Sequence, residues 1–210
     1  MEQYVDLLYG WNNKLNLISR KDVENIWTRH ILGSVSFLFR STLRADASVV
    51  DIGTGGGLPG IPIAILRDDL RLLLVDSIQK KIMAVRDILS HLKLQQITAV
   101  AGRAEDLSRS MAYSGKYDYV IARAVAPIAD LIKWGKPFLK KKDSFSSHGQ
   151  EKGEISSGSI LMLKGGDLSA EIQSALVKCN PHSLDELSIS IDVGEANQDL
   201  FDKKLVIVQP

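Results

Sequence analysis

Apolar residues change their spacing near residue 45. Before it they recur every three or four positions, which is typical of amphipathic helices, and no strand pattern interrupts them. From residue 48 onwards, short runs of aliphatic and β-branched residues alternate with helical runs. The expected strands are Ser48–Ile52, Leu72–Asp76, Ile97–Ala101, Tyr117–Ala122, Ile160–Lys164, Leu187–Val193 and Leu205–Gln209. The expected helices between them are Ile61–Arg67, Lys80–Leu92, Ile128–Leu139 and Ala170–Lys178.

This alternation predicts an α/β fold. Strands and helices in regular succession build a parallel sheet that is covered by helices on both faces. No helix separates the last two strands, so we expect the sheet to end in an antiparallel pair. The chain is therefore predicted to form a doubly wound, seven-stranded, mostly parallel sheet of Rossmann-like type. Residues 1–44 would form a helical N-terminal cap, and residues 45–210 a cofactor-binding domain.

Composition excludes several classes of protein. The chain has one cysteine and four histidines scattered along its length, so neither a disulfide framework nor a metal site is expected. No apolar run reaches the roughly 20 residues of a membrane span. The first ten residues carry Glu2 and Asp6 instead of the basic head of a signal peptide. We therefore expect a reduced, metal-free cytoplasmic protein that is neither exported nor embedded in a membrane.

Charge is distributed unevenly, although the net charge is only +1. Residues 116–164 carry nine Lys and Arg against five Asp and Glu, whereas residues 165–210 carry three against eight. Part of the basic excess is the run Lys140, Lys141 and Lys142, which opens a polar stretch that is expected to be a loop. Two interpretations stay open: the run is a solvated loop, or it binds RNA phosphates.

A glycine-rich turn directly follows the first expected strand. Gly53, Gly55 and Gly57 allow the backbone to turn sharply and to approach a ligand that a Cβ would block. The helix expected to begin near Ile61 would point its unpaired N–H groups at the same place. Glycine turns are common, but one between an apolar strand and a helix is typical of nucleotide-binding sites.

The end of the second strand supplies a carboxylate at a suitable distance. Asp76 lies 19 residues after Gly57, close to the ~20 residues that separate such a glycine turn from a ribose-binding carboxylate. The alternative is an exposed carboxylate that caps the turn before Lys80. The spacing favours a nucleoside cofactor.

Two nucleoside cofactors fit this pattern, NAD and S-adenosylmethionine. Asp51 lies just before the glycines, where its charge would repel a pyrophosphate but could bind the cationic methionine end of S-adenosylmethionine. This favours the methyl donor. Asp51 could instead hydrogen-bond to the amides of the loop, which would not distinguish the two cofactors. An NAD-dependent oxidoreductase and a noncatalytic RNA-binding module on the same fold are the alternatives.

Several motifs occur in a characteristic order along nearly the whole chain. They are Trp11-Asn12 with Asn16-Leu17, Arg29-His30-Ile31-Leu32, Asp51 to Gly55, Leu58 to Pro62, Leu74 to Ser77 with Lys80-Lys81, Arg103-Ala104-Glu105, Arg123-Ala124 and Leu163-Lys164-Gly165. In this order and spacing they resemble the GidB/RsmG family of bacterial ribosomal RNA guanine-N7 methyltransferases. The segment Leu58-Pro59-Gly60-Ile61-Pro62 is the part least expected by chance.

The resemblance implies a class I methyltransferase with S-adenosylmethionine as cofactor. The implied cofactor contacts are Gly53, Leu58, Asp76, Ala104, Glu105 and Arg123. Glu105 also follows the third strand, at the edge where such sheets bind ligands, and could accept a hydrogen bond from the adenine amine. Its alternative role is a negative charge at a helix N-terminus.

The implied substrate is a guanine of small-subunit ribosomal RNA, free or in an assembly intermediate, and we expect the enzyme to be a monomer. Guanine N7 has a lone pair and loses no proton when it is methylated, so the reaction requires no general base. Orientation should dominate catalysis. Arg123 and Lys164, at the ends of the fourth and fifth strands, are the candidate catalytic residues. Arg123 would hold guanine or a flanking phosphate, or would instead pair with a carboxylate across the crevice.

Arg29 and His30 are further candidates for binding the substrate, together with the three lysines of the polar stretch. His30 falls on an apolar helix face with Ile26, Trp27 and Ile31. A buried structural histidine is therefore an equal alternative.

Overall fold

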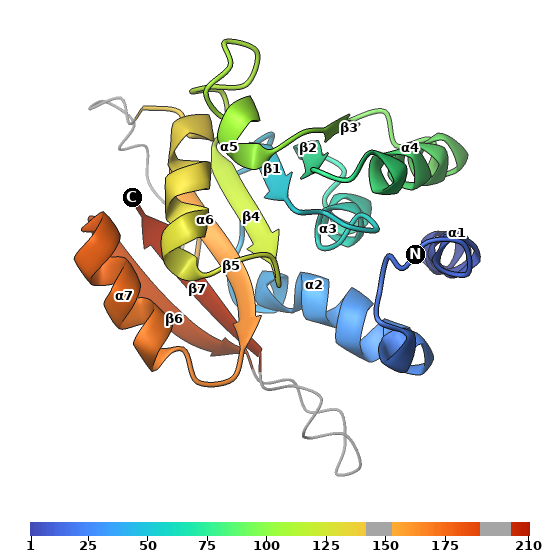
Figure 1. The fold of residues 1–210 in the computed structure, drawn as a ribbon, viewed down its shortest axis with the longest axis horizontal. Coiled ribbons are helices and arrows are strands. Elements are labelled where there is room, and N and C mark those ends of the chain that lie inside the picture. Colours follow the sequence, from blue (N-terminus) through green and yellow to red (C-terminus); the bar gives the residue numbers. More distant parts are fainter. Residues whose placement is uncertain (142–152, 190–202) are drawn as a thin grey trace.

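A computed structural model describes residues 1–141, 153–189 and 203–210 of the chain (Figure 1). The strands of its central sheet are β1 (Ser48–Ile52), β2 (Arg71–Asp76), β3 (Ile97–Ala101), β4 (Tyr119–Arg123), β5 (Ser159–Gly165), β6 (Ser183–Ile189) and β7 (Lys203–Gln209). Their order in the sheet is β3-β2-β1-β4-β5-β7-β6. The first five strands run parallel, and β7 lies antiparallel between β5 and β6. This confirms the predicted doubly wound, seven-stranded, mostly parallel sheet.

Helices cover both faces of the sheet, which explains why its central strands are apolar on both sides. The helices that follow the strands are α3 (Gly60–Leu66), α4 (Gln79–Leu92), α5 (Ala104–Leu107), α6 (Ile128–Gly135) and α7 (Ser169–Cys179). Neighbouring residues of β1 face opposite ways: Val49 lies in the core beneath α3 and α4, and Val50 in the core beneath α6 and α7. Within the described ranges, no helix has the length and apolar character needed to cross a membrane.

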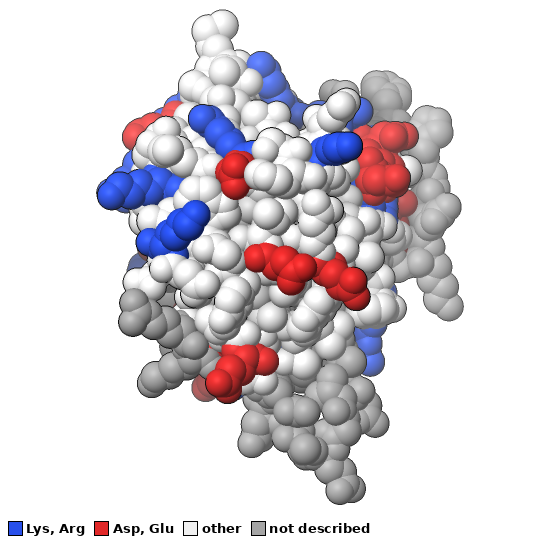
Figure 2. Space-filling model, turned by 90° about the vertical axis from the view of Figure 1, so that its right-hand side faces the viewer, with Lys and Arg blue, Asp and Glu red and all other residues white. Residues whose placement is uncertain are grey.

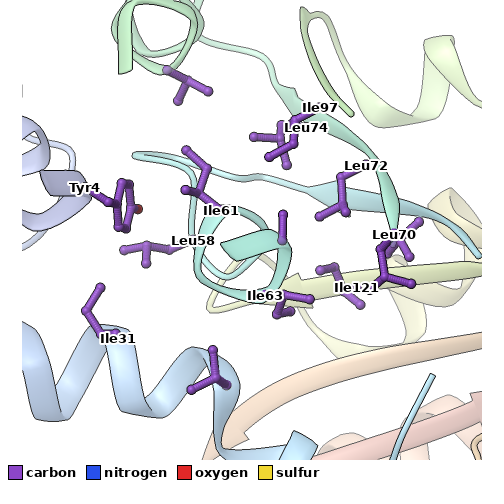
Figure 3. Close-up of a cluster of buried hydrophobic side chains, with 14 of the residues drawn as sticks. Tyr4, Ile31, Leu58, Ile61, Ile63, Leu70, Leu72, Leu74, Ile97 and Ile121 are labelled. Carbon is purple, nitrogen blue, oxygen red and sulfur yellow. The ribbon is translucent and has the colours of Figure 1, made fainter. Parts of the chain in front are cut away.

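Residues 1–44, which the sequence predicts to be an N-terminal cap and which we call the cap, contribute to the first of these cores. The helical segments of the cap are α1 (Glu2–Asn12), η1 (Arg20–Asn25), η2 (Ile26–Leu32), α2 (Gly33–Val35) and η3 (Ser36–Phe39). Tyr4 and Ile31 of the cap lie next to Leu58 and Ile61, which follow β1 (Figure 3). The indole of Trp11 also donates a hydrogen bond of 2.7 Å to the carboxylate of Asp87 on α4. The cap therefore rests directly on the segment that the sequence identifies as the cofactor loop.

One segment of the cap departs from the expected helical spacing. The segment η2 is a π-helix, in which hydrogen bonds join residues five apart. Ile26 and Ile31 are five apart and both are buried, whereas Trp27 is 45% exposed. The expectation that Trp27 shares the buried face is therefore wrong, because that expectation assumed the spacing of an α-helix.

The largest differences from the predicted boundaries are at β6 and α6. The strand expected at Leu187–Val193 begins at Ser183 instead, and residues 190–193 lie outside the described residues. Its pairing with β7 starts at Ser183, yet most of its side chains are exposed, so no apolar pattern marks this edge strand. The helix expected to reach Leu139 ends at Gly135, because Pro137 has no N–H to continue it.

Candidate functional site

The glycine loop, residues 53–57, joins the carboxyl end of β1 to α3. Gly53, Gly55 and Gly57 have positive φ angles of 71°, 58° and 98°, a conformation that other residues rarely adopt. The loop is also closely covered. A Cβ built on Gly53 would lie 2.5 Å from the Cγ2 atom of Val125, and one on Gly57 would lie 2.3 Å from the Cδ1 atom of Ile61. Glycine therefore suits the backbone conformation at all three positions, and at Gly53 and Gly57 it also leaves room for these side chains.

Asp76 ends β2 beside this loop. Its Oδ2 atom accepts a hydrogen bond of 3.0 Å from the Gly55 amide, and its Oδ1 atom accepts one of 2.8 Å from the Ile78 amide. A carboxylate can accept about four hydrogen bonds, so two of them leave capacity for a ligand. The structure thus brings Asp76 and the glycine loop together at the carboxyl edge of the sheet.

Asp51 is fully buried beneath the loop. Its Oδ2 atom accepts hydrogen bonds from the Thr54 hydroxyl at 2.7 Å and from the Gly60 amide at 2.9 Å. Burial raises the pKa of Asp51 to about 7, although these two hydrogen bonds oppose the rise. Its Oδ1 atom has no hydrogen-bond partner among the described residues. This geometry matches the alternative in which Asp51 shapes the loop, and its contact with the methionine end stays a prediction.

Ala104 and Glu105 begin the short helix α5 after β3. Ala104 is buried, and Glu105 is partly exposed in the first turn. The amide of Gly102, just before them, donates a hydrogen bond of 3.0 Å to the Asp76 carbonyl oxygen. The end of β3 is thereby held next to the end of β2, on the side of the site where the adenine contact was predicted.

Arg123 ends β4, and its guanidinium contacts the cap. The Nη1 atom donates to the His30 carbonyl oxygen and to the Ser34 hydroxyl, both at 2.9 Å. The Nη2 atom lies 2.8 Å from the Arg29 carbonyl oxygen and 2.9 Å from the His30 Nδ1 atom. None of these four partners is a carboxylate. The described structure therefore gives Arg123 a docking role toward the cap, and its contact with guanine stays a prediction.

His30 is held as a neutral side chain. Because its Nδ1 atom accepts the hydrogen bond from Arg123, the proton belongs on Nε2. The Nε2 atom is buried without a hydrogen-bond partner among the described residues, 3.9 Å from an oxygen of Asp22. Burial, and then the positive charge of Arg123, lower the pKa of His30 to about 4. Arg29 forms an ion pair with the same Asp22 at 2.9 Å.

This low pKa predicts a specific dependence of stability on pH. An unfolded chain protonates His30 near its ordinary pKa of 6.5, whereas the folded protein resists protonation until about pH 4. The stabilising contribution is therefore complete above pH 6.5 and is lost as the pH falls toward 4, by about 2–3 kcal/mol. We expect His30→Asn to flatten the free energy of unfolding against pH, measured by urea denaturation. Both proteins keep every carboxyl group, so parallel curves would show that His30 is not the cause.

Lys164 lies near the carboxyl end of β5, with a side chain that is 12% exposed. Its Nζ atom donates to the Ala126 carbonyl oxygen at 3.1 Å and to Glu171 Oε2 at 2.7 Å. The structure therefore places Lys164 against the loop that follows β4. Its catalytic role stays a prediction.

The lysine run lies at the other end of the sheet, as far as it is described. Lys140 donates a hydrogen bond of 2.8 Å to Asp118, which also accepts one from the Ser48 amide at the start of β1. Burial opposes ionisation of Asp118, but the hydrogen bonds from Lys140 and Ser48 lower its pKa to about 2. Lys140 is thus tied to the amino edge of the sheet, Lys141 is exposed, and Lys142 lies outside the described residues. Their binding to RNA stays a prediction.

Charge on the face that carries α1 and α4 is mixed. Figure 2 shows Lys and Arg side chains separated from one another in its upper and left parts, with Asp and Glu across its middle. A continuous basic stripe is therefore absent from this view. Among the described residues, no group of three His, Cys, Asp or Glu side chains could hold a metal ion.

Sequence reasoning missed the cap residues that touch the glycine loop. The hydroxyl of Tyr4 donates a hydrogen bond of 3.0 Å to the Gly56 carbonyl oxygen. A Cβ on Gly56 would lie 2.6 Å from Leu8 Cδ1 and 3.2 Å from Leu17 Cβ. These contacts join segments about 40 to 50 residues apart, so no local pattern could have indicated them.

Solved structures share this fold. An SAM-dependent methyltransferase from Aquifex aeolicus matches with a TM-score of 0.56 and 9% identity, covering 87% of this chain and 90% of that chain. Precorrin-6y C5,15-methyltransferase from Geobacter metallireducens matches with a TM-score of 0.55 and 14% identity, covering 92% and 90%. At such identities the likeness shows the fold alone.

Sequence relatives are much more similar. Ribosomal RNA small subunit methyltransferase G of Flavobacterium johnsoniae is 40% identical over 172 residues, which cover 81% of this chain and 75% of the relative. The protein of the same name from Flavobacterium psychrophilum is 35% identical over 209 residues, covering 100% and 88%. The GidB family, described as rRNA small subunit methyltransferase G, matches residues 1–200. The chain therefore belongs to the GidB family.

Proposed function

We propose that this protein transfers the methyl group of S-adenosylmethionine to N7 of a guanine in small-subunit (16S) ribosomal RNA. The observation that carries the proposal is the placement of the glycine loop beside Asp76, in a chain of the GidB family. An NAD-dependent oxidoreductase is set aside, because the matching family is described as a methyltransferase family. The substrate would be free RNA or a ribosomal assembly intermediate, met in the cytoplasm.

The residues present fit the cofactor. Asp76 would accept hydrogen bonds from the ribose hydroxyls, and Glu105 one from the adenine amine. The backbone of the glycine loop and Leu58 would contact the rest of the molecule. When it is bound, the cofactor supplies a methyl group on a positively charged sulfur.

The reaction requires the protein to orient the methyl donor and the guanine. The N7 lone pair forms the new bond to carbon as the bond from carbon to sulfur breaks, so the positive charge passes from sulfur to the purine and no proton moves. The nearby titratable groups suit this, because His30 is tied to Arg123 and Asp51 is enclosed beneath the loop. Holding the two reactants in line can supply several kcal/mol of the barrier reduction.

Asp76 offers a direct test of the cofactor site. Asp76→Ala should weaken binding of S-adenosylmethionine by about 1–3 kcal/mol, because hydrogen bonds to a carboxylate are lost. The measurement is isothermal titration of the folded protein with S-adenosylmethionine and, separately, with NAD. Asp106→Ala is the matched control, since Asp106 is an exposed acidic residue of the nearby helix α5. Unchanged affinity in Asp76→Ala would remove the ribose assignment.

The same proteins then test the reaction. Transfer of tritium-labelled methyl groups is measured with naked 16S RNA and with small subunits as substrates. Wild type and Asp106→Ala should label RNA at one guanine, and Asp76→Ala should need more cofactor for the same rate. RNA binding without any transfer would support the noncatalytic alternative.

A further inference from the structure

The loop of residues 124–127, between β4 and α6, lies against the glycine loop. Its first residue, Ala124, has a positive φ angle of 53°, which is uncommon for alanine. The side chain of Val125 covers Gly53, close enough that no Cβ fits between them. The position of this loop therefore determines how much space is left above the first glycine of the proposed cofactor site.

Two side chains hold this loop near the start of α6. Lys164 Nζ donates to the carbonyl oxygen of Ala126 at 3.1 Å and to Glu171 Oε2 at 2.7 Å. The same oxygen of Glu171 accepts a hydrogen bond of 3.2 Å from the Ile128 amide, in the first turn of α6. The loop is thus bound near its C-terminal end by a pair that comes from β5 and α7.

Glu171 joins Lys164 to the start of α6, because one of its oxygens bonds to both. Burial would raise the pKa of Glu171, but hydrogen bonds from Lys164 and the Ile128 amide lower it overall, so the side chain stays a carboxylate. Its charge compensates the mostly buried ammonium of Lys164, whose other described partner, the Ala126 carbonyl oxygen, carries no charge. It also lies at the N-terminus of α6, where negative charge is favourable.

We propose that Glu171 is a positioning residue for methyl transfer, and that Lys164 acts through the Ala126 carbonyl oxygen rather than by contact with the substrate. Together they set the position of Val125 over Gly53. The expected change in the rate of methyl transfer rests on the proposed function. The expected change in the position of Val125 rests on the described contacts alone. It assigns a role to Glu171 that neither the motifs nor the comparisons give it.

The test uses Glu171→Gln, Lys164→Met and the double variant in the full chain. At saturating cofactor and RNA, each single variant should lower kcat on the order of tenfold. A misplacement of reacting groups by about 1 Å can lower a rate roughly 100-fold, and we expect the loop to move by less than that. KM for RNA should change little, and the double variant should be no slower than the slower single variant, since both break one clamp. Lys164→Arg should recover part of the rate. Asp167→Asn is the matched control, because exposed Asp167 bonds only to Ser169 among the contacts described.

A second measurement separates this inference from the proposed function. The methyl resonances of Val125 and the amide resonance of Gly53, recorded by NMR without RNA, should shift in Glu171→Gln and Lys164→Met and stay in place in Asp167→Asn. Wild-type kcat and Val125 resonances in Glu171→Gln, with a slow Lys164→Met, would overturn the clamp and assign Lys164 to the substrate. Shifted resonances with wild-type kcat would overturn the positioning role. A wild-type protein that transfers no methyl group would end the proposed function, while the resonances still test the clamp.

Discussion

Arg123→Ala is expected to slow single-turnover methyl transfer by roughly 100-fold while it weakens S-adenosylmethionine binding much less. The variant removes the guanidinium that joins the end of β4 to the cap. It leaves two carbonyl oxygens, the Ser34 hydroxyl and the His30 ring nitrogen without this donor, and an unsatisfied buried polar group costs about 1–3 kcal/mol. The cap should therefore loosen beside the site. Quenched single-turnover assays measure the rate of methyl transfer, and isothermal titration measures the affinity for S-adenosylmethionine.

Hydrogen exchange then distinguishes the two roles considered for Arg123. If Arg123 acts by docking the cap, amides of residues 26–34 should exchange faster in Arg123→Ala. Ser34→Ala, which removes one of the hydrogen-bond partners, should show a smaller change in exchange and in rate. Slow transfer with unchanged exchange in residues 26–34 would contradict docking and favour direct contact with guanine or a phosphate.

The parts of this molecule that the sequence predicts are those made by consecutive residues. The strand β1, the glycine loop and the start of α3 follow one another between Ser48 and Gly60, so pattern and turn chemistry suffice to place them. Asp76 could be predicted because it ends a strand that pairs in parallel with β1, which brings the two ends to one edge.

The parts that the sequence does not predict depend on distant partners. The partners of Arg123 lie 89 to 94 residues away, and half of them are backbone atoms, which carry no signature in the sequence. Glu171 escapes notice for the same reason, because its partner Ile128 is 43 residues away. The π-helical segment η2 and the exposed edge strand β6 are poorly predicted for another reason. The spacing of their apolar residues does not follow the usual periods of an α-helix or a half-buried strand.

Asp51 is a position where the sequence leaves two chemically sound interpretations open. The sequence allows it to bind a cation or to hydrogen-bond loop amides. Its complete burial, with bonds to Thr54 and Gly60, corresponds to the second, and burial raises its pKa to about 7. A carboxylate held in this way supports the shape of the loop, and its contact with the methionine end of the cofactor stays a prediction.

The largest effect is expected from a change in the RNA. Replacing the target guanine with 7-deazaguanine should abolish methyl transfer, because a C–H group then stands where N7 has its lone pair, while the size of the base hardly changes. No residue of the site can compensate, since the proposed reaction uses the lone pair itself as the nucleophile. Small subunits reconstituted with the substituted RNA are assayed for transfer from labelled S-adenosylmethionine.

Binding provides the control for this substitution. The 7-deazaguanine RNA should bind within roughly tenfold of the natural RNA, because one hydrogen bond to a base atom contributes about 0.5–1.5 kcal/mol and phosphate groups supply much of the affinity. Absence of transfer together with retained binding then identifies the reacting atom rather than a recognition defect. Methylation of the substituted RNA at the same nucleotide would show that another atom accepts the methyl group, and the N7 assignment would fall even though the chain belongs to the GidB family.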